Sequence, residues 1–114
     1  MKKSFYLLLM LSFIACSVKL VAPAQSDVDR VAGKYNGYTL NELNTGKALF
    51  EQTCNRCHRL KNPVSRNEGK WEKIVPVMIK KLNKKEGKEF INNVQEESIL
   101  RYLITMSSAP KSSR

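Results

Sequence analysis

The run Cys54-Asn55-Arg56-Cys57-His58 constrains the fold of this 114-residue chain more than any other feature. It holds the only histidine and two of the three cysteines. This CxxCH spacing is the attachment signature of a c-type haem, in which two thiols form thioethers to the vinyl groups and the adjacent imidazole becomes an axial ligand of iron. One helical turn holds both sulfurs at one edge of the porphyrin, and the next residue then projects beneath the metal. We therefore expect one covalent haem, held by Cys54, Cys57 and His58.

Two other uses of a CxxC pair are a structural zinc site and a thiol redox centre. A structural zinc ion needs four ligands, but Cys16 is the only further cysteine and His58 already belongs to the motif. A thioredoxin-like pair is set among strands that alternate with helices, whereas this chain has almost no period-2 apolar alternation. Both alternatives are weaker than haem attachment.

The N-terminal residues have the pattern of an export signal. Lys2 and Lys3 precede an uncharged apolar run over residues 5–15, which is too short to span a bilayer and has the length of a secretory signal. We therefore expect residues 1–15 to be a signal peptide. Haem is attached to CxxCH motifs outside the cytoplasm, so the two expectations agree although they depend on different residues.

Two alternative processing sites follow the apolar run. Phe13-Ile14-Ala15-Cys16 resembles a bacterial lipoprotein lipobox, although Phe13 departs from the usual leucine, and Cys16 would then carry the lipid that anchors the protein to a membrane. Ala22-Pro23-Ala24 is instead an A-x-A site, and cleavage after Ala24 would release a soluble periplasmic protein beginning at Gln25. We favour lipidation on the periplasmic side, because the third cysteine lies directly at the end of the apolar run.

Composition divides the rest of the chain into three parts. Residues 16–41 contain Pro23, Gly33 and Gly37 and no sustained apolar stripe, which predicts a lipid-anchored tether. Residues 42–108 are expected to form one domain, of a size at which an apolar core alone is marginal and a haem would add to it. Residues 109–114 are small and polar, which predicts a disordered tail.

Apolar periodicity predicts an all-α fold with three main helices around the haem. The first is expected over about residues 45–57, with Asn44 as its N-cap and with Leu49 and Phe50 facing inward. This helix would end in the haem motif.

The second and last helices each carry one apolar stripe. Pro76 interrupts the second, so that helix is expected to start late or to kink close to Met78. The last is expected to begin with a capping box from Asn92 to Gln95, with Ile91 packed as a staple residue. The stripes are Trp71, Ile74, Val75, Met78, Ile79 and Leu82 in the second helix, and Ile99, Tyr102, Leu103 and Met106 in the last.

The order of these features resembles small bacterial monohaem class I cytochromes c. The segment Trp71-Glu72-Lys73-Ile74-Val75-Pro76-Val77-Met78 matches the W-x-x-I-V-x-x-M segment of some members. The resemblance covers nearly the whole domain and implies a small cytochrome c fold, in which the first and last helices cross at a glycine and aromatic residues. The matching positions are Gly46, Leu49, Phe50, the haem motif, Leu60, Pro63, Trp71, Met78, Ile99, Tyr102 and Leu103, and the crossing would fall to Gly46, Phe50 and Tyr102.

The resemblance also implies roles around the iron. With one histidine in the chain, the sixth position is filled by methionine or lysine, or is open. The family pattern places the ligand at Met78, whereas Met106 lies near the end of the last helix. In the family, a proline carbonyl also accepts the imidazole N–H, and here that carbonyl would be the one of Pro63. Trp71 or Arg66 would hydrogen-bond a haem propionate, because a buried carboxylate needs a donor or a counter-charge.

Histidine and methionine on opposite sides of iron favour the ferrous state and leave no place for a substrate. We therefore expect an electron carrier that passes single electrons between exported or membrane redox partners, and not an enzyme. One alternative is a haem-binding subunit or sensor with an open iron site. Another is a module through which electrons enter a larger oxidoreductase complex.

The chain has a formal net charge of +10, and lysines are dense after Met78. This face is either simply solvated or a docking surface for acidic redox proteins or anionic lipid. Nucleic acid is not an expected partner, because an exported protein rarely meets it. The lysines are Lys80, Lys81, Lys84, Lys85 and Lys88.

Overall fold

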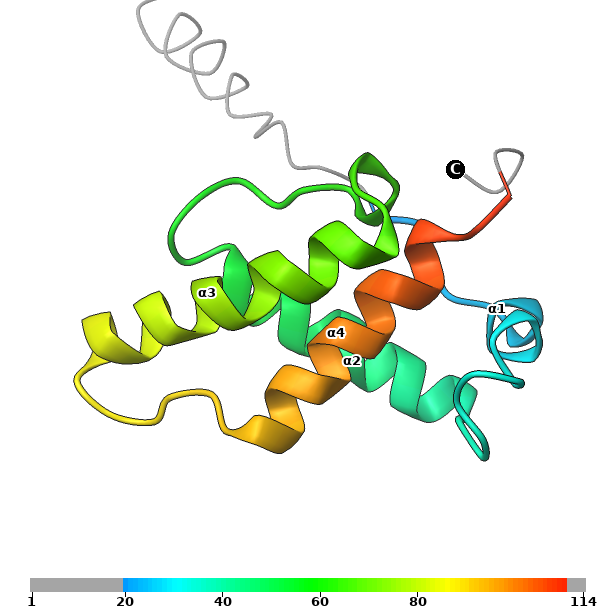
Figure 1. Cartoon of the computed structure of the whole chain (residues 1–114), viewed down its shortest axis with the longest axis horizontal. Coiled ribbons are helices and arrows are strands. Elements are labelled where there is room, and N and C mark those ends of the chain that lie inside the picture. Colours follow the sequence, from blue (N-terminus) through cyan, green and yellow to red (C-terminus); the bar gives the residue numbers. More distant parts are fainter. Residues whose placement is uncertain (1–19, 111–114) are drawn as a thin grey trace, which may run out of the picture.

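The computed structural model describes residues 20–110, which form helices and no strand (Figure 1). The all-α prediction is confirmed for this part of the chain. The predicted signal peptide, Cys16 and the last residues of the predicted tail lie outside the described residues. The elements are α1 (Gln25–Arg30), α2 (Leu40–Cys54), the 3-10 helix η1 (Pro63–Ser65), α3 (Glu68–Glu86) and α4 (Asn93–Ser107).

The helix before the haem motif, α2, begins earlier than predicted because its N-cap is Thr39 and not Asn44. Thr39 Oγ1 accepts the backbone N–H of Glu42 at 3.1 Å, and Glu42 Oε2 accepts the backbone N–H of Thr39 at 2.8 Å. This reciprocal capping box satisfies two N–H groups at the helix start. Asn44 lies inside the helix, where its side chain donates to the Leu40 carbonyl at 3.0 Å.

The next long helix, α3, runs unbroken through Pro76, so the predicted late start was wrong. Its N-cap is Asn67, whose Oδ1 accepts the Lys70 N–H at 3.0 Å. Proline leaves the carbonyl of residue 72, four positions earlier, without its helical donor. Both Pro76 and Glu72 are exposed, so water can bond to that carbonyl and the helix continues.

The last helix, α4, begins as predicted. The Asn92 and Gln95 side chains each accept the other's backbone N–H, at 2.9 and 3.0 Å, which confirms the capping box. Ile91 is buried, and its backbone N–H and carbonyl both bond to the side-chain amide of Asn83 on α3. The predicted inward face is confirmed as well, because Ile99, Tyr102, Leu103 and Met106 are all buried.

The crossing of α2 and α4 depends on Gly46. A Cβ atom at this position would lie 2.4 Å from the Ser98 carbonyl oxygen and 2.8 Å from Tyr102 Cβ. Only a glycine therefore lets the two backbones approach this closely. One helical turn later, Phe50 packs against Tyr102 with ring centroids 5.6 Å apart. The structure thus has the glycine and aromatic crossing that the family pattern implies for these residues.

Part of the predicted tether is folded, which corrects the boundary at residue 42. In residues 25–38 the side chains of Val28, Val31 and Tyr38 are buried in the core. Arg30 donates from its guanidinium to the Thr105 carbonyl on α4 at 2.8 Å. The tether prediction failed because these apolar residues join the common core, where α1 contacts both α2 and α4. At the other end, Ala109 is buried although the tail was predicted to begin there.

Candidate functional site

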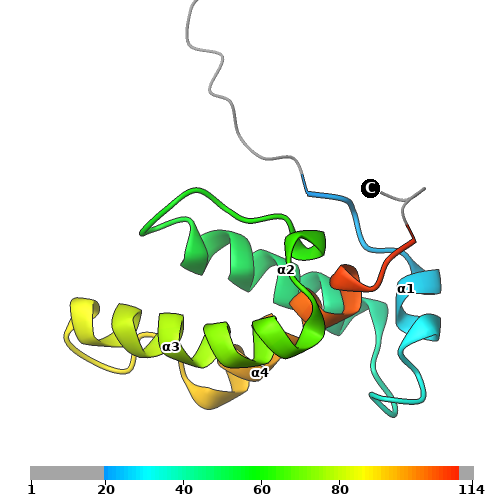
Figure 2. The same ribbon diagram turned by 45° about the horizontal axis from the view of Figure 1, so that its top comes forward.

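Two cavities lie between α2 and α3, with volumes of about 330 and 350 Å³. Cys54, His58 and Met78 line both of them. In Figure 2 the chain leaves the end of α2, arches over one side of this region and returns through η1 to the start of α3. The remaining lining residues are Thr53, Cys57, Ile79, Lys81, Leu82 and Lys85 in the first cavity, and Phe50, Lys61, Arg66 and Trp71 in the second.

The two motif cysteines have different environments. Cys54 is buried at the last residue of α2, whereas Cys57 is exposed in the turn that follows, and neither forms a disulfide. Burial raises the pKa of the Cys54 thiol to about 11, and the nearby Cys57 adds to the rise. Both thiols border the first cavity, so two free sulfurs face the same space.

The imidazole of His58 is oriented by the backbone. Its Nδ1 lies 2.8 Å from the Arg59 carbonyl oxygen, which can only accept, so Nδ1–H is the donor and Nε2 carries the lone pair. A metal-binding histidine is commonly held in this way through its second ring nitrogen. The family pattern assigned this role to the Pro63 carbonyl. In the structure, the carbonyl of Arg59, the residue after His58, has this role instead.

The carbonyl of Pro63 is bonded by another group. It accepts the indole N–H of Trp71 at 2.9 Å, a buried hydrogen bond that ties η1 to α3. The Trp71 N–H predicted to meet a propionate is therefore engaged within the protein. Arg66 stacks over the same indole, with its guanidinium carbon 5.1 Å from the ring centroid, and it lines the second cavity with Lys61. Lys61 was not singled out from the sequence, where it is one lysine among many.

The two candidate methionines lie in different places. Met78 is half-buried on α3 and borders both cavities that His58 borders. Met106 is buried on α4 and borders neither; it lines a separate small cavity with Pro63 and Tyr102. The structure therefore brings Met78, and not Met106, together with the predicted haem ligands.

These residues fit a covalently held haem. Two free thiols stand beside an imidazole whose Nε2 is available, and a thioether lies on the facing helix. Phe50, Trp71, Ile79 and Leu82 give apolar walls, while Lys61 and Arg66 supply positive charge for carboxylates at one side. Cys54, Cys57, His58 and Met78 are the residues that could hold the group.

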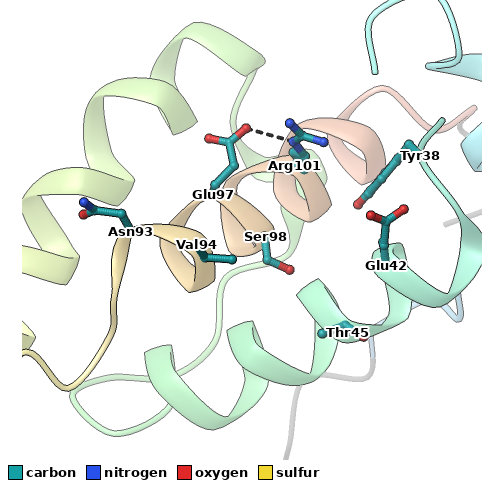
Figure 3. A pocket seen from close by; sticks show the side chains of 8 residues that line it. All are labelled: Tyr38, Glu42, Thr45, Asn93, Val94, Glu97, Ser98 and Arg101. Atoms are coloured by element: carbon teal, nitrogen blue, oxygen red, sulfur yellow. Dashed lines mark hydrogen bonds and ion pairs between the residues drawn. The ribbon is translucent and has the colours of Figure 1, made fainter. Parts of the chain in front are cut away.

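A fourth cavity, of about 490 Å³, lies between the start of α2 and α4, and Figure 3 shows the side chains that line it. Arg101 donates to Glu97 at 2.8 Å there, and its guanidinium carbon lies 6.0 Å from the centre of the Tyr38 ring. Burial raises the pKa of Tyr38 to about 12. None of the predicted site residues lines this cavity.

Comparison with known proteins identified no relative, since no family model, no curated protein and no solved structure matches the chain. Within residues 20–110, no three histidine, cysteine or acidic side chains gather in a way that could hold a metal ion. No helix in that same range is long and apolar enough to cross a membrane.

Proposed function

We propose that this protein is a monohaem c-type cytochrome that carries single electrons. Haem c would be attached through Cys54 and Cys57, with His58 and Met78 as the axial ligands. The observation that carries the proposal is that Cys54, His58 and Met78 border the same pair of cavities between two helices, and that Cys57 borders the first of them. A haem held there supplies one-electron redox chemistry.

The chain's own residues then have separate tasks. The Arg59 carbonyl holds the His58 ring through Nδ1, which would leave Nε2 free to bind iron. Met78 would supply the second protein ligand to the iron, which would leave no place for a substrate. Phe50, Trp71, Ile79 and Leu82 keep water from the site, while Lys61 and Arg66 meet carboxylates at its edge.

We propose further that the helices form a small cytochrome c fold. The close crossing of α2 and α4 at Gly46, with Phe50 against Tyr102, supports this assignment. So does the chain order, in which the haem motif follows α2 directly and the candidate methionine lies on α3. Here α2, α3 and α4 would be the three main helices around the haem.

Redox proteins with acidic docking surfaces are the partners that we propose. The face after Met78 carries Lys80, Lys81, Lys84, Lys85 and Lys88, all exposed. Lys81 and Lys85 also line the first cavity, so positive charge surrounds one opening of the proposed haem site. Charge of one sign around such an opening attracts an oppositely charged partner and weakens in effect as salt rises.

Replacing Met78 with alanine tests the electron-carrier function. The oxidised wild type should show a weak red-region sulfur-to-iron band, and Met78→Ala should abolish it, lower the reduction potential and let carbon monoxide bind the reduced protein. The reason is that removing the thioether empties the sixth position. Absorption spectra of both proteins, oxidised and reduced, with and without carbon monoxide, provide the measurement.

Met106→Leu is the matched control, because Met106 borders neither cavity beside His58. It should keep the band and cost less than about 1.5 kcal/mol of stability, as a nearly volume-conserving core change. If Met106→Leu removes the band and Met78→Ala keeps it, the ligand assignment is reversed. If wild type already binds carbon monoxide without a band, the open-iron alternative replaces the electron carrier.

We also propose that the protein is exported and anchored to a membrane on the periplasmic side through a lipid on Cys16. Wild type should partition into the detergent phase, whereas Cys16→Ser should remain in the aqueous phase, because stable anchoring needs the acyl chains. Detergent phase separation of cells that express each protein measures this partition. Cys57, which is exposed in the haem motif, is unchanged in both proteins, so only the cysteine at position 16 differs. A mature N-terminus at Gln25 in the mass spectrum would show cleavage at the A-x-A site instead.

A further inference from the structure

The two walls of the proposed haem site are not packed on each other. Both α2 and α3 pack on α4, yet in the described part of the chain their backbones make no close contact with one another. In Figure 1, α4 crosses α2 and also lies against α3. Apart from their common packing on α4, side-chain contacts from residues 55–58 to α3 therefore link the haem motif to the helix that carries Met78.

One side chain makes such a contact, together with a second one to the loop that follows α3. Arg56 lies between the two motif cysteines, and its guanidinium donates to Glu86 Oε1 at 3.2 Å. The guanidinium carbon also lies 4.7 Å from the centre of the Phe90 ring. Glu86 is the last residue of α3, and Phe90 belongs to the loop that leads to α4. Arg56 thus joins the haem motif to the end of the facing helix.

The surface that Arg56 meets is itself held in place. Gly87 ends α3 in the left-handed conformation, with φ of +78°, which a residue with a side chain rarely adopts. Two hydrogen bonds between Asn83 and the Ile91 backbone, at 2.8 and 2.9 Å, then fix the far side of the same loop. Arg56 therefore binds to an anchored position and not to a freely moving loop.

The other contact between motif and helix is weaker. Lys85 Nζ lies 4.0 Å from Cys57 Sγ, which is long for a hydrogen bond to sulfur. If Cys57 forms a thioether, the thiol is consumed as well. The contacts of Arg56 involve no atom that haem attachment would alter, so attachment leaves the groups that make them unchanged.

We propose that Arg56 is a positioning residue that sets the separation of His58 and Met78 across the site. The inference rests on the proposed function, since it concerns the two axial ligands. Arg56 precedes His58 by two residues, and Glu86 follows Met78 by eight on the same rigid helix, about 12 Å along its axis. The contacts of Arg56 with Glu86 and Phe90 therefore fix the position of the segment that carries His58 relative to the helix that carries Met78.

The test compares amide hydrogen exchange at residues 55–58 in the haem-loaded wild type and its variants. Arg56→Gln removes both contacts and should raise the exchange rate about tenfold, while Glu86→Gln removes only the ion pair and should raise it about threefold. Adding Glu86→Gln to Arg56→Gln should change nothing further, because the pair is already broken. Lys73→Gln, which removes the same charge from an exposed α3 position with no described ion pair, should exchange like wild type.

A second readout separates positioning from general stabilisation. In Arg56→Gln the red-region band should disappear at a lower urea concentration than helix content, whereas both should be lost together in wild type and in Lys73→Gln. Two results would overturn this inference and leave the proposed function intact. One is an Arg56→Gln variant that carries covalent haem and whose amides at residues 55–58 exchange at the wild-type rate. The other is loss of the red-region band and of helix content at the same urea concentration in that variant. A wild type without covalent haem overturns the proposed function itself.

Discussion

The double variant Cys54→Ser, Cys57→Ser is expected to carry no covalent haem and to lose cooperative folding. Both sulfurs that would form the thioethers are removed, so the two cavities between α2 and α3 would lack the group that the account places between their apolar walls. A domain of this size has little stability to spare for such a loss. Thermal melting followed by far-ultraviolet circular dichroism, beside the visible spectrum, provides the measurement.

Asn55→Ser is the control within the same motif. Asn55 is exposed and lies at a position that the CxxCH spacing leaves free, so this variant should keep both the haem and the cooperative transition. A double cysteine variant that melts like wild type would show that the fold does not depend on the haem.

Gly46→Ala is expected to destabilise the protein by about 2 kcal/mol or more, which lowers the melting temperature by roughly 8–16 °C for a domain of this size. The new methyl group would lie 2.4 Å from a backbone carbonyl oxygen at Ser98, and a backbone atom can move away only if the α2–α4 crossing opens. That cost outweighs the roughly 1 kcal/mol by which alanine favours a helix interior over glycine. Thermal melting of the haem-loaded variant measures the effect.

Gly69→Ala is the matched substitution on α3. The nearest atom to its added Cβ would be the Asn67 side-chain oxygen at 3.9 Å, an ordinary contact. This variant should be as stable as wild type or more stable by up to about 1 kcal/mol. Equal melting temperatures for Gly46→Ala and wild type would contradict the close crossing.

The helices could be predicted from local patterns where local contacts decide the structure. The capping box of Asn92 and Gln95 and the stripe of α4 needed only residues close in sequence, and both were correct. The start of α2 depends on the same kind of signal, the Thr39 and Glu42 pair, but Asn44 is also a good capping residue, and the sequence pattern alone does not separate the two. The late start predicted from Pro76 does not occur, because Pro76 is exposed in the helix. That exposure is known only from the folded structure.

The segment before α2 could not be predicted in the same way. Val28, Val31 and Tyr38 are too few to make a core of their own, and they are buried because α2 and α4 supply the rest of the core. Arg101 lies with its guanidinium carbon 4.9 Å from the centre of the Tyr35 ring, which joins the same segment to α4. Contacts between residues so distant in sequence leave no periodic trace.

In the candidate site too, features set by residues close in sequence could be predicted, and features set by distant residues could not. The CxxCH spacing is a local signal, and the structure places its residues and Met78 around shared cavities. The hydrogen bonds of the site residues were not predictable, because Arg59 and Pro63 both follow His58 closely in the sequence and each has a carbonyl that could accept. Only the packing of Trp71 against η1 decides that Pro63 receives the indole N–H. Arg56 was missed for a similar reason, since Glu86 and Phe90 lie far from it in sequence.

The most direct test of the central claim is the mass of the wild-type chain, purified from a host that matures c-type cytochromes and measured under denaturing, reducing conditions. The account predicts a mass increased by one haem, and a band on a denaturing gel that keeps its red colour, because thioether bonds survive unfolding. A chain of unmodified mass that loses its colour on denaturation would contradict covalent haem attachment, and with it the proposed function.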